Sequence, residues 1–143
     1  MRPIVCATRG GEVSRRTQER AIALAKERDT ELIFLCVVDP RFVKLADESL
    51  AASLADELQR MGESLLSIAQ VRAQKQNVMT RTAVLHGTAW QNIEDYVRKV
   101  NADALVIGSP RTDSMPQAFG SGHVQQLAEE MRENTGVEVV VVT

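Results

Sequence analysis

The sequence predicts an α/β protein in which a five-stranded parallel sheet carries helices on both faces. β-rich runs alternate with helix-periodic stretches along the whole chain, which is the pattern of a parallel sheet with right-handed crossovers. Four of the five runs are continuously apolar, as expected of strands that are buried on both faces. A length of 143 residues corresponds to about one domain, so we expect residues 1–143 to form a single domain.

The expected strands are residues 3–8, 32–38, 78–85, 104–108 and 137–142. The third run alternates between polar and apolar residues, which is typical of an edge strand with one exposed side. Five strands in this alternation make the flavodoxin-like order 2-1-3-4-5 and its relatives the main candidates. The strand pattern alone does not choose between these orders.

Two of the expected helices carry long apolar stripes. The first has one face made of Val13, Thr17, Ala21, Leu24 and Ala25. The longest places apolar residues at spacings of four and three, at Leu54, Leu58, Met61, Leu65 and Ile68. A coiled-coil seam would have this spacing, but the stripe covers only about two heptads, which favours packing on the sheet.

The two remaining helices show signals at their ends. Thr88 and Gln91 have the spacing of a capping box, and Trp90 just after the start is expected in the core. The last helix carries Val124, Leu127, Ala128 and Met131, and its expected end is the run Asn134-Thr135-Gly136.

Composition excludes several classes of partner. The net charge is -2, so the chain lacks the basic footprint of a protein that binds nucleic acid or an anionic membrane. Aromatic residues make up 3% of the chain, too few to stack against a flavin or a series of bases. Cys6 and Cys36 lie in separate apolar runs without metal-binding spacing, and we expect both to be buried free thiols.

The amino-terminal residues give no sign of export. The apolar run that begins at Pro3 reaches Arg9 too early for a signal peptide, and no apolar run approaches 18 residues. We therefore expect a soluble, cytoplasmic protein.

Two loops have the composition of a ligand site. In an open parallel sheet the ligand lies beyond the carboxyl ends of the strands, where the strand order reverses. The loop after the first strand contains Gly10 and Gly11, and the loop after the fourth strand leads to Gly120-Ser121-Gly122 at the start of the last helix. Glycines allow close backbone approach, and a helix start offers free N–H groups to a phosphate. Neither loop contains a Walker A or GxGxxG motif.

The chain resembles the universal stress protein family over essentially its full length. The resemblance is carried by the runs Ile4-Val5-Cys6-Ala7-Thr8, Leu35-Cys36-Val37-Val38-Asp39-Pro40 and Asn101-Ala102-Asp103-Ala104-Leu105-Val106-Ile107-Gly108-Ser109. It implies a five-stranded fold of strand order 3-2-1-4-5 and a homodimer. Some members of this family bind ATP and others do not.

The nucleotide motif of the ATP-binding members is only partly present. That motif, Gly-x2-Gly-x9-Gly-Ser/Thr, begins here at Gly108, but Arg111 replaces its second glycine, and Gly120-Ser121 follows after eight residues instead of nine. The aspartate that the family places near the end of the first strand is replaced by Arg9. The two arginines can either hold a phosphate in bidentate fashion or cover a site that has lost its ligand.

The resemblance and the loop chemistry together give a set of candidate ligand-binding residues. Val38 and Asp39 are expected near a base by resemblance, and the glycines and Ser121 near phosphates. The full set is Thr8, Arg9, Gly10, Val38, Asp39, Gly108, Arg111, Gly120, Ser121 and Gly122. The ligands to consider are ATP or AMP, with Mg²⁺ accompanying ATP, or no cofactor at all.

Catalysis has little support in the sequence. His86 is expected at a strand end and His123 in the first turn of the last helix, and neither has partners at a spacing that would indicate a metal or a nucleophile. At most we expect slow ATP hydrolysis, for which no general base is evident. A phosphoacceptor receiver domain is excluded because Arg9 stands where acids would be required.

The last strand indicates a homodimer. Residues 137–142 contain five valines and one charge, and such a strand at a sheet edge is a template for pairing with a second chain. The leading hypothesis is a homodimeric stress-response module that binds a nucleotide and does not turn it over strongly. The alternative is a dimeric protein-interaction scaffold that has lost nucleotide binding.

Overall fold

Strands and helices alternate strictly in the computed structural model, which describes residues 2–8, 11–38, 48–108 and 124–142, without the side chains of 11–13, 48–52, 55, 89 and 124. In chain order the elements are β1 (Ile4–Ala7), α1 (Gly11–Arg28), β2 (Leu32–Val38), α2 (Glu48–Gln74), β3 (Thr80–His86), α3 (Ala89–Val100), β4 (Ala104–Gly108), α4 (Val124–Thr135) and β5 (Glu138–Val142). The expected ranges of β2 and β4 match residue for residue, and those of the other strands agree within two residues.

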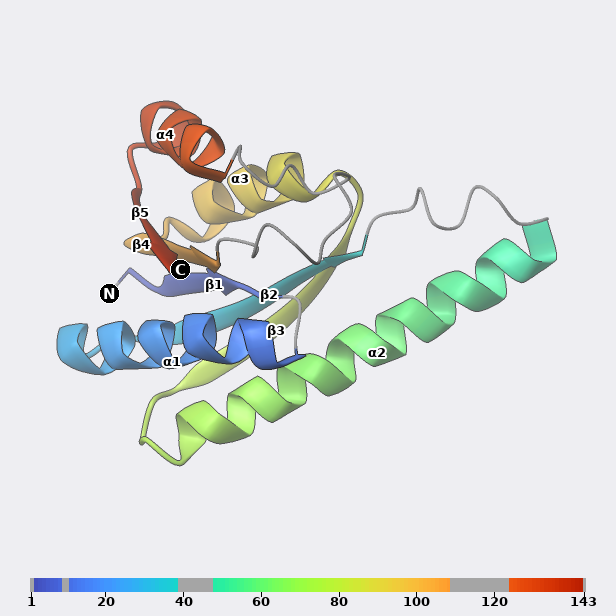
Figure 1. The fold of residues 1–143 in the computed structure, drawn as a ribbon, viewed down its shortest axis with the longest axis horizontal. Helices are drawn as coiled ribbons and strands as arrows, with labels where there is room; N and C mark the ends of the chain where they lie inside the picture. The colour runs from blue at the N-terminus through green and yellow to red at the C-terminus, as the bar shows by residue number, and fades with distance from the viewer. Residues whose placement is uncertain (1, 9–10, 39–47, 109–123, 143) are drawn as a thin grey trace.

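The sheet has the order β3-β2-β1-β4-β5, and every neighbouring pair of strands is parallel. This confirms the order that the family resemblance implies and decides against 2-1-3-4-5. The third strand lies at one edge, as its alternating pattern predicts, and β5 lies at the other (Figure 1).

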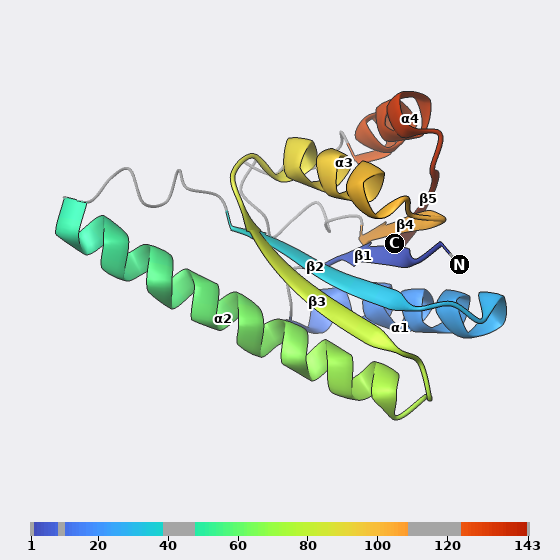
Figure 2. The same ribbon diagram turned by 180° about the vertical axis from the view of Figure 1, so that it is seen from behind.

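Each face of the sheet is covered by two helices, α1 and α2 on one side and α3 and α4 on the other (Figures 1 and 2). Successive residues of a strand point to opposite faces, and the two cores follow that alternation. On the first face, β1 contributes Ile4 and Cys6, which pack with Ala21 of α1 and Leu66 of α2. On the second, Val5 packs with residues of α3 and α4. The apolar strands β1, β2 and β4 are buried between the two helix layers, whereas β3 contributes only partly buried residues, Val84 to one core and Ala83 and Leu85 to the other.

Helix α1 buries the face that its sequence predicts. Thr17, Ala21, Leu24 and Ala25 are all buried, while Val13 belongs to the side chains outside the description. Gln18 and Ile22 are also buried, so the face is wider than the apolar stripe alone indicates.

Helix α2 does not pack on the sheet through the stripe that the sequence singles out. Its buried residues are the small Gly62, Ala69 and Ala73 and one large residue, Leu66. Leu54, Met61 and Ile68 of the stripe are 37%, 57% and 52% exposed. The helix does pack on the sheet as predicted, but of the stripe only Leu58 and Leu65 are half-buried. The face was misplaced because small residues, which bring the helix axis close to the sheet, carry little hydrophobic signal.

The helix ends agree only in part with the sequence. Thr88 is the N-cap of α3 but makes no side-chain capping hydrogen bond, and Gln91 instead donates to Asp95 of its own helix, so the predicted capping box does not form. Trp90 is half-buried against the second core. After α4, Gly136 has a φ of +71, and its N–H donates to the carbonyl of Arg132 at 2.8 Å, as expected of a helix stop.

Both thiols are free. Cys6 is fully buried in β1, and Cys36 in β2 is half-buried. Burial raises the pKa of both thiols above the ordinary value, because an apolar environment disfavours the thiolate. The expectation of buried thiols is thus confirmed for Cys6 and met in part by Cys36.

Candidate functional site

The strand order reverses at β1, and this places the candidate site. From β1 the chain crosses to β2 on one side, and it later returns to add β4 on the other side. The carboxyl ends of β1 and β4 are neighbours, because Ala7 is in register with Ile107. Thr8 and Gly108 follow these residues directly. The two loops that the sequence selects therefore leave the sheet from adjacent positions, at the kind of switch point where open α/β sheets bind ligands.

Thr8 anchors the end of β1 to the helix layer beneath it. Its backbone N–H donates to the carbonyl of Leu35 at 2.9 Å, which extends the pairing with β2 by one residue. Its hydroxyl oxygen accepts a hydrogen bond of 3.0 Å from Nε2 of Gln18 in α1. Both side chains are buried. The Thr8 hydroxyl is thus tied into the fold, and its role at the site is to fix where the following loop begins.

The polar chain continues from Gln18 to α2. Oε1 of Gln18 accepts a hydrogen bond of 2.8 Å from a guanidinium nitrogen of Arg72. A buried amide whose oxygen and nitrogen are both bonded incurs little of the desolvation penalty of an unpaired polar group. The chain from Thr8 through Gln18 to Arg72 therefore connects β1, α1 and α2 at the base of the candidate site.

Gly108 is required by the packing of α1. A Cβ atom at this position would lie 2.6 Å from the hydroxyl oxygen of Thr17, well inside contact distance. Thr17 is itself buried, with 3% of its surface exposed, and a β-branched side chain has few alternative rotamers. The close approach of α1 to the end of β4 is sufficient to explain a glycine at 108.

Val38 ends β2 at the same edge of the sheet. It is 9% exposed, it is in register with His86 of β3, and its carbonyl accepts a hydrogen bond from the N–H of Gly87. Val38 is one strand removed from Thr8. The structure thus brings Thr8, Val38 and Gly108 to one edge. The other predicted residues lie outside the described residues: Arg9, Gly10, Asp39, Arg111, Gly120, Ser121 and Gly122.

His86 is a titratable residue that the structure describes at this edge of the sheet. His86 is exposed at the end of β3, as predicted, and its Nε2 lies 2.5 Å from Oε1 of Gln59. His123 lies outside the described residues. The part of the chain that the structure describes contains no group of three His, Cys, Asp or Glu residues that could hold a metal ion.

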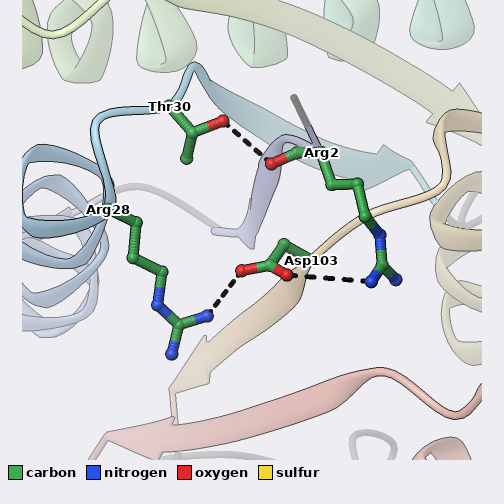
Figure 3. Close-up of a pocket in the computed structure, with 4 residues that line it drawn as sticks. All are labelled: Arg2, Arg28, Thr30 and Asp103. Atoms are coloured by element: carbon green, nitrogen blue, oxygen red, sulfur yellow. Dashed lines mark hydrogen bonds and ion pairs between the residues drawn. The ribbon is translucent and has the colours of Figure 1, made fainter.

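A second cluster lies at the opposite, amino end of the strands (Figure 3). Arg2, Arg28, Thr30 and Asp103 line an open pocket there. Arg28 at the end of α1 donates to Asp103 at 2.7 Å and to Glu138 of β5 at 2.6 Å, and these two carboxylates raise the pKa of its guanidinium further. Arg2 also lies 3.8 Å from Asp103 and donates to the carbonyl of Ala102. The charges of this pocket are paired with one another, which is the arrangement of a structural clamp.

Sequence reasoning missed Thr17, Gln18 and Arg72. Thr17 was counted only as part of a core stripe, and Arg72 stands four residues after Ile68 with no distinguishing neighbour. The sequence does contain a signal for Gln18. It lies three residues before Ala21 and four before Ile22, which puts it on the same face of α1 as these apolar residues. A glutamine on the buried face of a helix indicates a specific hydrogen-bond partner.

Comparison with known proteins gives one consistent result. The sequence model of the universal stress protein family matches residues 1–143. A universal stress protein of Methanocaldococcus jannaschii is 29% identical over 140 residues, which is 97% of this chain and 80% of the relative.

Solved structures share the fold. A universal stress protein in complex with cAMP has a TM-score of 0.71 at 19% identity, over 99% of this chain and 97% of that chain. The universal stress protein from Archaeoglobus fulgidus in complex with dAMP has a TM-score of 0.66 at 19% identity, over 100% and 98% of the two chains. Among the described helices of this protein, none is long and apolar enough to cross a membrane.

Proposed function

The chain belongs to the universal stress protein family, and we propose that it is a homodimeric, cytoplasmic stress-response module that binds an adenine nucleotide or another phosphorylated ligand. The site proposed for the ligand consists of the loops that follow β1 and β4. We propose no turnover of the ligand beyond slow hydrolysis of ATP.

The observation that carries this proposal is the juxtaposition of Thr8 and Gly108. The register of β1 with β4 makes these two residues neighbours at the point where the strand order reverses. The two loops whose glycines, serine and arginines suit a phosphate begin immediately after them. Ligands of open α/β sheets occupy this position as a rule.

The ligands of the structural neighbours support the chemical class. The two neighbours described above carry cAMP and dAMP, both of which join an adenine to a phosphate. In this chain we assign the phosphate to Arg9, Arg111 and the residues 120–122 that precede α4, since guanidinium groups and helix starts bind phosphate well. We assign the adenine to Val38 and Asp39 at the end of β2.

A protein-interaction scaffold without a nucleotide is the second candidate, and Gly108 favours it. The packing of Thr17 against Gly108 would preserve this glycine even in a chain that binds nothing. The replacement of the expected glycine by Arg111 and of the expected aspartate by Arg9 is also compatible with a closed site.

Ligand release and thermal titration separate the two candidates. The purified protein is denatured, and the supernatant is tested for nucleotide by chromatography and absorbance. ATP and AMP are then titrated, with and without Mg²⁺, while the melting temperature is followed. A ligand at 100 times its Kd adds about 2.7 kcal/mol to the free energy of unfolding, which for a chain of this size raises Tm by roughly 5 to 10 °C.

Three variants identify the site. If Arg9 and Arg111 hold the phosphate, Arg9→Asp and Arg111→Gly each weaken nucleotide binding. Arg81→Met is the matched control, because it also removes one cation, in this case a side chain of β3 that is paired with Glu31 before β2. Tighter binding in the two site variants would contradict the phosphate role, and a chain that releases no nucleotide and shows an unmoved Tm would leave the scaffold as the function.

The homodimer is proposed through β5. This strand lies at the edge of the sheet, and Val140, Val141 and Val142 are only half-buried, so a second copy of β5 would cover exposed valines and pair an open edge. Equilibrium sedimentation at micromolar concentration is expected to give at least twice the chain mass of 15.8 kDa. A monomer would count against this assembly.

A further inference from the structure

Helix α2 carries an outward-facing stripe that has no partner among the described residues. Seven exposed positions recur at spacings of three and four along one side of the helix: Leu54, Glu57, Met61, Ser64, Ile68, Val71 and Lys75. Lys75 continues the helical turn, since its N–H donates to the carbonyl of Val71 at 3.0 Å. We call this set the outer stripe. It has the 3.5-residue period of a coiled-coil seam.

Between Glu57 and Lys75 the outer stripe is apolar except at Ser64. Met61, Ile68 and Val71 are 57%, 52% and 49% exposed, which is unusual for three large side chains on one helix face. Glu57 flanks these apolar residues on one side and Lys75 on the other, and Leu54 lies one turn before Glu57. Helix α2 forms the outer border of the molecule, and its first turns extend past the sheet (Figures 1 and 2), so this face is accessible to another molecule.

The charge of the surrounding surface changes sign along α2. Near its carboxyl end, Arg72 and Lys75 line a groove of about 560 Å³ together with Arg15, Glu19 and Lys26 of α1. Arg15 is paired with Glu19 and Arg72 bonds the neutral Gln18, while Lys26 and Lys75 have no ion pair within the described residues. Toward the amino end of α2, the exposed charges are Asp56, Glu57 and Arg60, two acidic and one basic.

We propose that the outer stripe is a self-association surface, on which the α2 helices of two copies of this chain pack antiparallel about a two-fold axis that crosses the stripe midway between Ser64 and Ile68. In this register Glu57 of each copy meets Lys75 of the other. Met61 likewise meets Val71, and Ser64 meets Ile68. Six layers result over a length of roughly 27 Å: two central layers of Ser64 with Ile68, an apolar layer of Met61 with Val71 on either side, and an ion pair at each end. Leu54 lies beyond the paired stretch.

The charges along α2 favour an antiparallel orientation of the two helices and a second copy of this chain as the partner of the outer stripe. In a parallel pair Glu57 would face Glu57 and Lys75 would face Lys75, whereas the antiparallel pair places opposite charges together. The amino-terminal part of the partner's α2, which is acidic, then lies beside the groove whose lysines lack carboxylate partners. A single surface that presents the apolar residues and both charges in the matching order is self-complementary, as a two-fold interface must be. Within one chain Glu57 pairs with Arg60 at 3.1 Å. Exposed ion pairs of this kind contribute little free energy, so Glu57 can leave Arg60 and pair with Lys75 of the other copy.

Disulfide trapping tests the register. The variant Met61→Cys/Val71→Cys places two thiols opposite each other only in the proposed antiparallel pair, so mild oxidation is expected to give a covalent dimer on a non-reducing gel. Met61→Cys and Val71→Cys alone are the matched controls and should remain at monomer mass on this gel, because each thiol is ten residues from its own copy along the seam. Efficient cross-linking of the single variants would indicate a parallel pair and overturn the proposal, as would a double variant that does not cross-link.

Charge reversal tests the same surface without new cysteines. Glu57→Lys and Lys75→Glu alone each place like charges together and are expected to lower the average mass in sedimentation velocity, while the double variant Glu57→Lys/Lys75→Glu should restore the wild-type mass. All positions are exposed, and unchanged circular dichroism and Tm verify that the variants fold. Equal masses for all four proteins would refute the pairing and leave the stripe to a different protein partner.

This pairing is independent of nucleotide binding and of the β5 interface. Loss of the covalent dimer in the trapping experiment leaves the β5 dimer unaffected, and disruption of β5 pairing leaves the trapped α2 dimer intact on the denaturing gel. If both interfaces form, each chain has two different two-fold contacts, and the wild-type protein is expected to assemble beyond a dimer.

Discussion

The two ends of the sheet are built from different kinds of interaction. At the amino end, exposed and half-exposed charges pair with one another, with Arg28 shared between Asp103 and Glu138. At the carboxyl end, the interactions run inward, from buried Thr8 through Gln18 to Arg72, and Thr17 packs against Gly108. At the amino end the charged side chains bind one another. At the carboxyl end the buried contacts fix Thr8 and Gly108, the residues after which the two loops begin.

This difference indicates which end of the sheet can accommodate less change in side-chain geometry. Exposed ion pairs contribute little to the free energy of unfolding, and their long side chains can adjust. A buried amide with two partners and a glycine in contact with a β-branched side chain admit only one geometry. Substitutions at the carboxyl end should therefore be the more damaging.

The largest effect is expected for Gly108→Ala. The new Cβ would lie 2.6 Å from the hydroxyl oxygen of Thr17, and overpacking of this kind lowers the free energy of unfolding by about 1 to 3 kcal/mol. Urea denaturation measures the loss. The double variant Gly108→Ala/Thr17→Ala should recover part of it, since the obstructing oxygen is then absent, and strict additivity of the two single changes would disprove the clash.

Gln18→Leu should have the next largest effect. Leucine fills similar space but leaves the Thr8 hydroxyl without its donor and Arg72 without its acceptor, which costs about 1 to 2 kcal/mol of unfolding free energy. The matched variant at the amino end is Arg28→Met, which removes two ion pairs of a side chain that is 32% exposed and should cost less than about 1 kcal/mol. If Arg28→Met proves the more damaging in urea denaturation, the contrast between the two ends is wrong.

The thiols of β1 and β2 make the free energy of unfolding depend on pH in the alkaline range. The pKa of Cys6 and of Cys36 is raised by burial, so above about pH 9 the unfolded chain releases thiol protons that the folded chain retains. The unfolded state then binds fewer protons, and the free energy of unfolding falls as pH rises, by at most about 1.4 kcal/mol per pH unit for each thiol. Stability should be level from pH 7 to 8.

The measurement is urea denaturation from pH 7 to 10, with Cys6→Ala/Cys36→Ala as the comparison. The double variant is less stable at neutral pH because it loses buried volume, but its stability should decline less between pH 9 and 10 than that of the wild type. If the free energy of unfolding falls equally in the two proteins between pH 9 and 10, the thiols do not cause the loss of stability at alkaline pH.

The residue ranges of the strands could be predicted from the sequence itself, but the order of the strands in the sheet could not. Runs such as Leu32–Val38 are apolar throughout and end at turn residues, so both limits are visible locally. Strand order depends on which way each crossover turns, which no single run encodes, and it was available only through resemblance to a family. At the site, the strand pairing brings Thr8, Val38 and Gly108 to one edge of the sheet, and the ligand role of the two loops stays a prediction.

The residues that could not be predicted are those whose role depends on a distant partner. Small residues at Gly62, Ala69 and Ala73 bring α2 against the sheet, yet the large residues of the same helix dominate its hydrophobic pattern. Gln18 and Thr17 act through contacts with Thr8 and Gly108, about ten and ninety residues away in the chain.

The contact between Thr17 and Gly108 also bears on how the ligand motif is inherited. A glycine that a neighbouring helix requires is under selection for folding, regardless of what binds nearby. Descendants of a nucleotide-binding ancestor could lose the ligand and keep this glycine indefinitely, while the loop positions that only the ligand constrains would drift. For this chain, the residues at positions 9 and 111, where the sequence has arginines, are therefore more informative about ligand binding than Gly108.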